Sequence, residues 1–528
     1  MKIPISDNTE NGQLSAGKNI SCWFESDIFT NHFPELTQNE ETDVVIVGGG
    51  LAGISTAYCL TQSGKKVIVV EDGFIGSGET GRTTAQMVTA LDDRYFNMTK
   101  NFGVEKTALI AQSHKKAIDF IEYTVKKEKI DCGFERVPGY LFLHESDKPE
   151  NLNKEYDTLL TCGLEAYLLD ETPGIPNEGR SILYPDQAQF QPLKYILGLC
   201  KAIEEKGGKL FINTHASKID SKGIESDKGF KITASHVVVA TNAPVNDTYS
   251  MILKQWAYRS YVIAALVKKN ILPQALWWDT GEQNKDTNST AYHYVRLHAF
   301  NDEFDLLVAG GEDHESGKPG NHSEEEKYLI LEKWTRERFP IGEVVSKWSG
   351  EVMVPMDSIA YIGRNQHDKD NVYIITGDAG IGMTYCTIGG ILISDLINGK
   401  QNEWESIYAP SRFTLSASKP FFRMLKEDAV EILKKWFHTE SSELNSIQND
   451  EGKIVKLDGK KLGAYRNKAG QLFLVSAECS HLQCIVKWNN DEKSWDCPCH
   501  GSRFTYSGKV INGPANENLA SYSDLTRN

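Results

Sequence analysis

The stretch Asp43-Val-Val-Ile-Val-Gly48-Gly49-Gly50-Leu51-Ala52-Gly53 places an apolar run directly before the spacing Gly-x-Gly-x-x-Gly. A helical pattern follows over residues 54–63, and Lys66-Val-Ile-Val-Val-Glu71 predicts a second buried strand that ends in an acid. Two buried strands joined by a glycine turn and a helix are typical of a dinucleotide-binding α/β unit. A glycine-rich structural turn is the alternative, and the strands and the acid argue against it.

The residue types in this unit predict individual contacts with a dinucleotide. Gly48 permits the tight turn, Gly50 lets the backbone approach a pyrophosphate, and Gly53 allows close packing of the helix on the strand. The open helix N-terminus stabilises phosphates through its amides and dipole. We therefore expect Leu51 and Ala52, in the first turn, to border the cofactor. The carboxylate of Glu71, 23 residues after Gly48, is expected to bond a ribose hydroxyl.

A second pattern lies near the C-terminus, in Cys479-Ser-His481-Leu-Gln-Cys484 and Cys497-Pro-Cys499-His500-Gly-Ser. Two thiolates and two imidazoles are the ligands of a Rieske [2Fe–2S] centre, in which histidines replace two cysteines on one iron. The same set can bind zinc. The additional cysteine in each loop, Cys484 and Cys499, favours the iron–sulfur alternative, and with it one-electron chemistry.

Together with Gly513-Pro514, these loops closely resemble the Rieske family. The resemblance implies that Cys479 and Cys497 ligate one iron, that His481 and His500 ligate the other, and that Cys484 and Cys499 form a disulfide. High-potential members of the family carry a Tyr where this chain has Phe504 and usually a Gly where it has Gln483, whereas Ser502 is retained. Because hydrogen bonds to the sulfurs raise the reduction potential, we expect a potential below the high-potential class.

Residues 41–400 resemble the D-amino-acid oxidase or glycine oxidase family of FAD enzymes. The segments that carry the resemblance are Gly76-Ser-Gly-Glu-Thr-Gly-Arg-Thr-Thr-Ala-Gln86, His236-Val-Val-Val-Ala-Thr-Asn-Ala243 and Ile374-Ile-Thr-Gly-Asp-Ala-Gly-Ile-Gly382. It implies an α/β fold, with a FAD-binding Rossmann-type (glutathione-reductase-like) domain and an inserted antiparallel β-sheet substrate domain. The FAD contacts it implies beyond the first glycine turn are Arg82, Thr83, Ala216, Thr241, Asn242, Gly377, Gly380 and Ile381.

The sequence also offers candidate residues for the substrate side of the inserted sheet. Arg296 is the best anchor for a substrate carboxylate, because a guanidinium binds a carboxylate bidentately; a structural ion pair is the alternative. Tyr292 is a second candidate, and His293 and Tyr294 are weaker ones. A mononuclear iron on His293 and His298 is disfavoured, because no upstream Asn or Asp stands at the expected spacing. Cys386 could attach flavin covalently, but a buried thiol is the simpler interpretation.

Length and motifs predict four regions in the chain of 528 residues. They are an N-terminal extension (1–40), the FAD-dependent oxidoreductase (41–400, with substrate-domain insertions at about 134–190 and 251–350), a helical linker (401–449) and an all-β Rieske domain (450–528). The net charge of −15 and the lack of a basic tract argue against nucleic acid as a partner. Without a long apolar stretch or a signal core we expect no transmembrane anchor and a cytoplasmic protein.

These patterns predict an oxidoreductase with FAD and one [2Fe–2S] cluster. We expect FAD to oxidise an amine or amino acid, and the cluster to pass electrons singly to an external one-electron carrier protein, ferredoxin-like or other. No second glycine motif for a nicotinamide cofactor is present. Two alternatives stay open: a flavin-dependent reductase fed by the cluster, and a non-catalytic electron-transfer or redox-sensing protein.

Overall fold

The computed structural model describes residues 19–24, 33–246, 251–283, 292–318, 320–366, 368–414, 423, 426 and 444–522. Much of the expected helical linker (401–449) lies outside the described residues, as does most of the N-terminal extension. Within the described part of the chain, no helix combines the length and the apolar character that a bilayer crossing requires.

The first layer is an eight-stranded sheet with the order β16-β17-β10-β1-β2-β7, extended by β8 and β9. Its central strands pair in parallel and are almost entirely buried, which explains their continuous apolar runs. The strands are β1 (Glu40–Val47), β2 (Val67–Val70), β7 (Lys209–Phe211), β8 (Ala216–Asp220), β9 (Gly223–Ser226), β10 (Lys231–Val239), β16 (Tyr361–Arg364) and β17 (Val372–Thr376).

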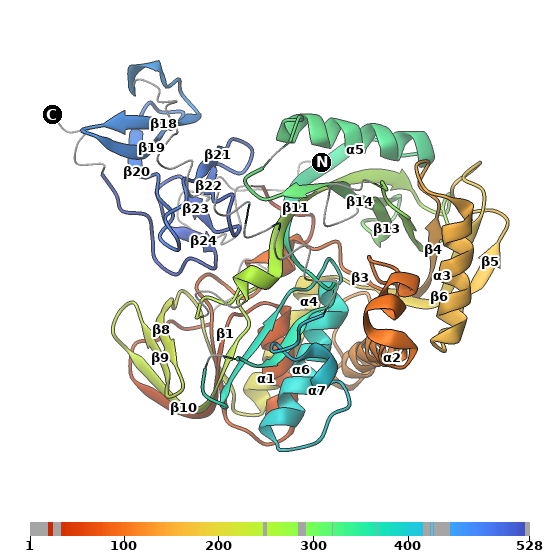
Figure 1. The fold of residues 1–528 in the computed structure, drawn as a ribbon, viewed down its shortest axis with the longest axis horizontal. Helices are drawn as coiled ribbons and strands as arrows, with labels where there is room; N and C mark the ends of the chain where they lie inside the picture. The colour runs from red at the N-terminus through yellow and green to blue at the C-terminus, as the bar shows by residue number, and fades with distance from the viewer. Residues whose placement is uncertain are drawn as a thin grey trace.

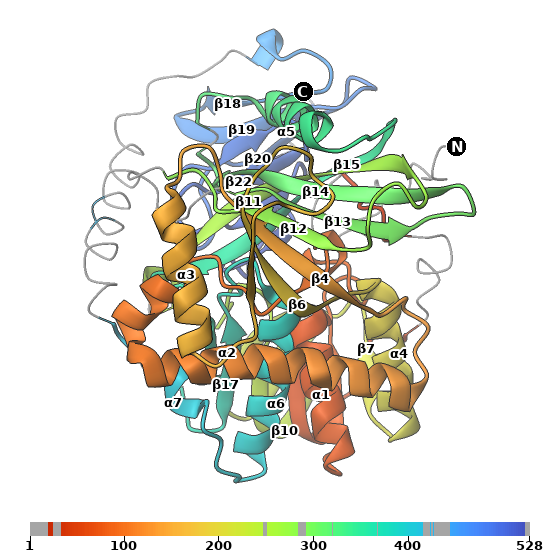
Figure 2. The ribbon, with the colours of Figure 1, turned by 90° about the vertical axis from the view of Figure 1, so that its right-hand side faces the viewer.

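Helices cover this sheet (Figure 1), and α1 packs against both α4 and α6. The close approach of α1 and α6 depends on Gly390, because a Cβ there would lie 2.8 Å from the Ser55 backbone. Long α2 crosses below the second sheet (Figure 2). The helices of the first domain are α1 (Leu51–Gln62), η3 (Glu79–Arg82), α2 (Tyr95–Glu128), α3 (Pro149–Thr161), α4 (Pro192–Glu205), η4 (Ile252–Lys254), α5 (Glu324–Arg338), α6 (Gly382–Ile397) and α7 (Glu405–Tyr408).

The second layer is a nine-stranded, mostly antiparallel sheet with the order β15-β11-β14-β13-β12-β4-β6-β3, to which β5 adds at β6. Both predicted insertions contribute strands to it. Helix α5 covers one face and begins in a capping box of Ser323 and Glu326. The strands are β3 (Gln86–Met87), β4 (Glu135–Phe142), β5 (Tyr167–Leu169), β6 (Ser181–Gln189), β11 (Gln255–Lys268), β12 (Leu276–Asp279), β13 (Tyr294–Ala299), β14 (Phe304–Glu315) and β15 (Val344–Pro355).

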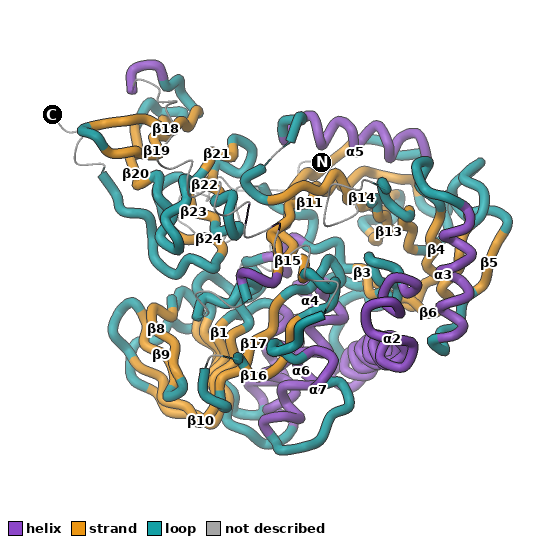
Figure 3. The backbone as a smooth tube through the Cα atoms, in the orientation of Figure 1, coloured by secondary structure: helices purple, strands orange, loops and turns teal. Residues whose placement is uncertain are grey.

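The C-terminal part is built from two small antiparallel sheets, and it lies beside β11 (Figure 1). Figure 3 shows it as strands joined by loops, with one short helical turn. Its core contains the fully buried rings of Trp495 and Phe504. The elements are η6 (Leu444–Ser446), β18 (Glu451–Leu457), β19 (Lys460–Arg466), β20 (Leu472–Ser476), β21 (Lys487–Asn489), β22 (Ser494–Asp496), β23 (Arg503–Thr505) and β24 (Val510–Asn512). The predicted fold class, an α/β domain with an inserted antiparallel sheet followed by an all-β domain, is confirmed.

Candidate active site

A cavity of about 290 Å³ lies where three parts of the molecule meet. The carboxyl ends of β1, β2 and β10 form one wall, and β11, β13 and β14 form another. The third wall comes from the C-terminal domain, in residues 510–513, 515 and 516. Ligands of open parallel sheets bind at the carboxyl ends of the strands, so this is the expected place for a dinucleotide.

The first glycine turn has the shape that its sequence predicts. Gly48 has φ +112°, and a Cβ there would lie 2.4 Å from the carbonyl oxygen of Ala240. A Cβ on Gly53 would lie 1.9 Å from the oxygen of Gly48, so this position packs α1 and does not line the cavity. Gly50 is the N-cap of α1 and caps it with no side chain, which leaves the start of the helix open toward the cavity.

Glu71 lines the cavity at the end of β2. One carboxylate oxygen accepts the Gly49 N–H at 2.6 Å, and the other accepts the Gly73 N–H at 2.9 Å. Burial raises the pKa of Glu71 to about 6, against the lowering effect of these hydrogen bonds. Glu71 therefore holds the glycine turn itself, in addition to facing the place where a ribose is expected.

The residues of this cavity fit FAD. Apart from Gly53, every residue that the sequence predicts to contact FAD lines it. Among the described residues, five buried polar atoms of the wall have no hydrogen-bond partner: Gln86 Nε2, Asn242 Nδ2, Asp313 Oδ1, Asp378 Oδ1 and Tyr385 Oη. Such orphans need explaining, and a polar ligand that spans the cavity supplies the partners. The Cys386 thiol also lines the wall, and burial raises its pKa.

The inserted sheet turns a polar and aromatic face to the cavity. The Tyr292 hydroxyl donates to Asp92 Oδ1 at 2.9 Å, and Ser260 Oγ lies 2.7 Å from the Tyr294 hydroxyl. Burial raises the pKa of Asp92 to about 7 and that of Asp313 to about 6. Tyr292 was predicted as a site residue, whereas both aspartates were missed. Asp313 lies near the end of a predicted strand, which is only a weak indication of a site residue. Asp92 belongs to no recognisable sequence motif.

Arg296 requires a correction. It does not line the cavity. Its guanidinium Nη1 donates instead to the carbonyl oxygens of Thr84, Ala85 and Phe190 at 2.9–3.1 Å. The side chain is 1% exposed and cannot reach a substrate carboxylate. Arg296 is thus a structural residue that ties the loop beside the cavity to the end of β6.

The two histidines of the inserted sheet do not come together either. The His293 ring lies 2.9 Å from Asp279 and 3.1 Å from Glu312, and it stacks on Trp334. The His298 ring packs edge-on against Trp23 at 5.0 Å. Residues five apart in an extended segment point to opposite faces, so they share no metal site.

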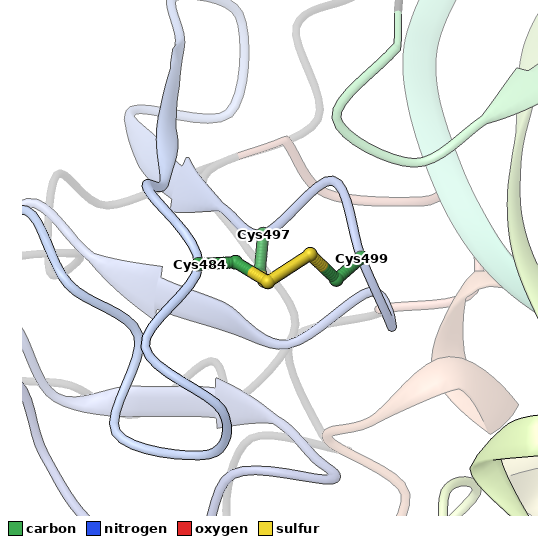
Figure 4. Close-up of side chains that lie close together, drawn as sticks. All are labelled: Cys484, Cys497 and Cys499. Carbon is green, nitrogen blue, oxygen red and sulfur yellow. A yellow bond between two sulfur atoms is a disulfide. The ribbon is translucent and has the colours of Figure 1, made fainter. Parts of the chain in front are cut away.

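The two Cys–His loops of the C-terminal domain meet as their pattern predicts. Cys484 and Cys499 form the disulfide that the resemblance implies (Figure 4). The sulfurs of Cys484, Cys497 and Cys499 lie within 4.8 Å of one another, but the disulfide removes two of them as thiolate ligands. The buried thiols of Cys479 and Cys497 are in hydrogen-bonding contact.

The His481 and His500 rings lie 5.3 Å apart, centre to centre. Two buried thiols and two neighbouring imidazoles are a donor set that fits a Rieske cluster, with thiolates on one iron and histidines on the other. Ser502 hydrogen-bonds Cys479, whereas Phe504 offers no donor.

Charged side chains join the C-terminal domain to the cavity. Arg82, at the end of η3 in the cavity wall, pairs with Glu492 at 2.8 Å. Asn512 Nδ2 donates to Glu79 Oε1 at 2.7 Å. The ligand-bearing loop packs on β11, since a Cβ on Gly501 would lie 2.2 Å from Cβ of Ala257.

Comparisons with known proteins agree with this two-part organisation. Residues 43–396 match the family described as FAD dependent oxidoreductase, and residues 436–523 match the Rieske [2Fe-2S] domain. A putative Rieske 2Fe-2S iron-sulfur protein of Bacillus subtilis is 31% identical over 490 residues, 92% of this chain and 94% of the relative. The gamma-glutamylputrescine oxidoreductase of Escherichia coli is 25% identical over 71% of this chain and 88% of that enzyme. The glycine oxidase of Geobacillus kaustophilus shares the fold, with a TM-score of 0.58 and 18% identity over 71% of this chain and all of that one.

Proposed function

We propose that this chain, which belongs to the family of FAD dependent oxidoreductases and carries a C-terminal Rieske domain, is an amine or amino-acid dehydrogenase. FAD and a [2Fe–2S] cluster are its cofactors. In this proposal the substrate is oxidised at a C–N bond and the electrons leave singly through the cluster to an external carrier protein. Two similar proteins, named for gamma-glutamylputrescine and glycine, support a substrate with such a bond.

FAD, when bound, takes up two electrons from a C–H next to nitrogen, and a Rieske cluster passes electrons one at a time. The protein's part is to hold, orient and exclude water. Gly48 and Gly50 give the pyrophosphate a bare turn at the start of α1, and the remaining FAD contacts form the walls. Cys479 and Cys497 would hold one iron, and His481 and His500 the other.

The observation that carries the proposal is the position of the C-terminal domain. Gly501 directly follows a predicted cluster ligand and packs on Ala257, and the next residue along β11, Tyr258, lines the cavity. Residues 510–513, 515 and 516 of the same domain contribute to the cavity wall. The two predicted redox sites therefore share one buried boundary, which supports electron transfer within a single chain.

The test is an anaerobic titration of the holoenzyme with amines, N-methyl amino acids and amino acids. Flavin absorbance and the cluster EPR signal are followed together. We expect one compound to bleach the flavin and then reduce the cluster, and we expect little peroxide when air is admitted. Rapid stoichiometric peroxide release would refute the dehydrogenase. Reduction of both centres only by dithionite or a reduced ferredoxin would show that electrons enter at the cluster.

A Cys479→Ser variant provides the matched control. It should keep FAD and still be bleached by substrate, because the flavin site does not depend on that thiol. It should fail to pass electrons to a one-electron acceptor such as ferricenium. Undiminished transfer to ferricenium would show that the cluster is not the outlet.

A further inference from the structure

The substrate side of the flavin cavity carries acids without an available base. Five acidic side chains line the cavity around the flavin-facing turns and the inserted sheet: Glu79, Asp92, Asp313, Glu351 and Asp378. Among the described residues that line the cavity, only Arg82 and His215 have basic side chains.

Both of these basic side chains are already engaged. The Arg82 guanidinium donates to the Glu492 carboxylate and to the carbonyl oxygens of Ser349 and Asn19. The His215 ring lies 3.2 Å from Asp72 Oδ2 and 3.1 Å from the carbonyl oxygen of Asn516. Since Asp72 directly follows Glu71, this is the end of the cavity where the ribose is expected. The described lining thus offers no cation to anchor a carboxylate at the substrate side.

Asp92 lies against the glycine-rich turn at residues 377–382. A Cβ on Gly380 would lie 2.8 Å from Asp92 Oδ2 and 3.6 Å from the Tyr292 hydroxyl. The turn is one of the predicted flavin contacts, so Asp92 borders the place where the reacting part of a substrate must lie. Its Oδ1 accepts from Tyr292, which orients the carboxylate and favours its charged form.

Asp313 supplies an independent observation on the other side of the same space. Its Oδ1 is buried and has no hydrogen-bond partner among the described residues. A buried acceptor of this kind needs a donor. The rings of Tyr292 and Tyr294 contact each other, with centres 5.4 Å apart at 51°, and they line the same cavity as the two acids. Carboxylates combined with tyrosine rings are the surroundings that an alkylammonium prefers, through ion pairing and cation–π attraction.

We propose that the substrate is an alkylammonium compound with no carboxylate on the carbon that is oxidised, held by Asp92 and Asp313 beside the rings of Tyr292 and Tyr294. This inference rests on the proposed function, because it uses the same flavin cavity. An α-amino acid would bring its carboxylate beside two acids, and the described cavity wall offers no free cation to match it. Like charges in a buried site disfavour such a complex, whereas an amine gains both counter-ions.

The first test uses probes that cannot react. Tetramethylammonium chloride and sodium acetate are titrated separately into the oxidised holoenzyme, and the change in flavin absorbance is followed. We expect saturable perturbation by the cation and none by acetate. Perturbation by acetate alone, or by neither probe, would overturn the inference.

Two variants locate the binding. Asp313→Asn should weaken tetramethylammonium binding at least tenfold, because it removes the negative charge of this carboxyl group and keeps its shape. The matched control is Asp93→Asn, since Asp93 lines only a smaller neighbouring cavity of about 40 Å³. It should bind the cation as the parent does. Equal affinity in the parent and Asp313→Asn would overturn the assignment.

The second test compares matched pairs that differ by one carboxylate: pentane-1,5-diamine with lysine, and dimethylamine with N-methylglycine. Faster anaerobic bleaching of the flavin by the amine of a pair is expected. Faster bleaching by the amino acid would overturn this inference and leave the proposed function intact. Cation binding without bleaching by any compound would support the site and count against the proposed function.

Discussion

The Arg82–Glu492 ion pair joins η3, in the wall of the flavin cavity, to the C-terminal domain, and both side chains are almost completely buried. The side chains are 3% and 1% exposed, and Nη1 lies 2.8 Å from Oε1. The carboxylate also accepts from Ser349 Oγ at 2.7 Å and from the Asn19 N–H at 3.1 Å. Burial alone would raise the pKa of Glu492, but the guanidinium of Arg82, and then that of Arg503, lower it to about 2.

Glu492→Gln keeps the size of the side chain and removes its charge, so that Arg82 stays buried with a neutral partner. Breaking one side of a buried pair costs about 3–5 kcal/mol. The pKa displacement from 4.5 to about 2 corresponds to about 3 kcal/mol at 1.36 kcal/mol per unit. We therefore expect the free energy of unfolding to fall by about 3 kcal/mol, roughly 100-fold in the equilibrium constant. Because the folded pKa is depressed, this contribution is present above pH 4.5 and is lost as the pH falls toward 2.

Urea titration of the holoenzyme at neutral pH measures the effect, with flavin fluorescence and the visible circular dichroism of the cluster as separate probes. The control is Glu403→Gln, whose partner is Lys116 in a pair with side chains 51% and 55% exposed. Such exposed pairs contribute about 0–1 kcal/mol. If Glu492→Gln unfolds at the same urea concentration as Glu403→Gln, the reasoning about the buried pair is refuted.

Three further predictions concern the cofactors and the acids of the cavity. Gly50→Val puts a side chain into the place proposed for the pyrophosphate, where a Cβ would have only Thr80 Oγ1 nearby, at 3.0 Å. The purified variant should lack the flavin spectrum and keep the cluster spectrum. Normal FAD content would contradict the assigned pyrophosphate position. Phe504→Tyr adds a donor beside the ligand loops, and one hydrogen bond of about 1 kcal/mol that favours the reduced cluster raises its potential by about 40 mV; an EPR-monitored redox titration that shows no rise would refute this. Burial raises the pKa of Asp92 to about 7, so its charge is present above that pH and lost below it. The affinity for tetramethylammonium should therefore fall as the pH drops from about 8 to about 5. An affinity independent of pH would exclude Asp92 as the counter-ion.

Local patterns account for what the sequence predicts well. The turn at Gly48 and the loops at Cys479 and Cys497 each need only a few consecutive residues, whose types and spacing are visible directly. Asp92 and Asp313 are more than 200 residues apart. Only the order of strands in the inserted sheet brings them to one space, and no short pattern records that order.

Arg296 shows where pattern reasoning ends. It lies two residues after Tyr294 on β13, so both side chains point to the same face of the sheet. Tyr294 lines the cavity, but the loop containing Thr84 and Ala85 covers the next position along the strand and takes up the guanidinium. The residue type suggested a carboxylate anchor, whereas its partners depend on a segment from another part of the chain.

The contribution of the cluster domain to the cavity wall links the two cofactor sites energetically. Asn516 Nδ2 donates at 3.0 Å to the carbonyl oxygen of Ala216, one of the predicted FAD contacts, and Asn512 Nδ2 donates to Glu79. A ligand that binds only the docked arrangement stabilises it in proportion to its affinity. FAD should therefore strengthen docking of the Rieske domain, and the loss of the Arg82–Glu492 pair should in turn weaken FAD. In Glu492→Gln, flavin should therefore be released at a lower urea concentration than the one at which the cluster signal is lost. The reason is that the flavin site needs both domains in place, whereas the cluster is held within one domain.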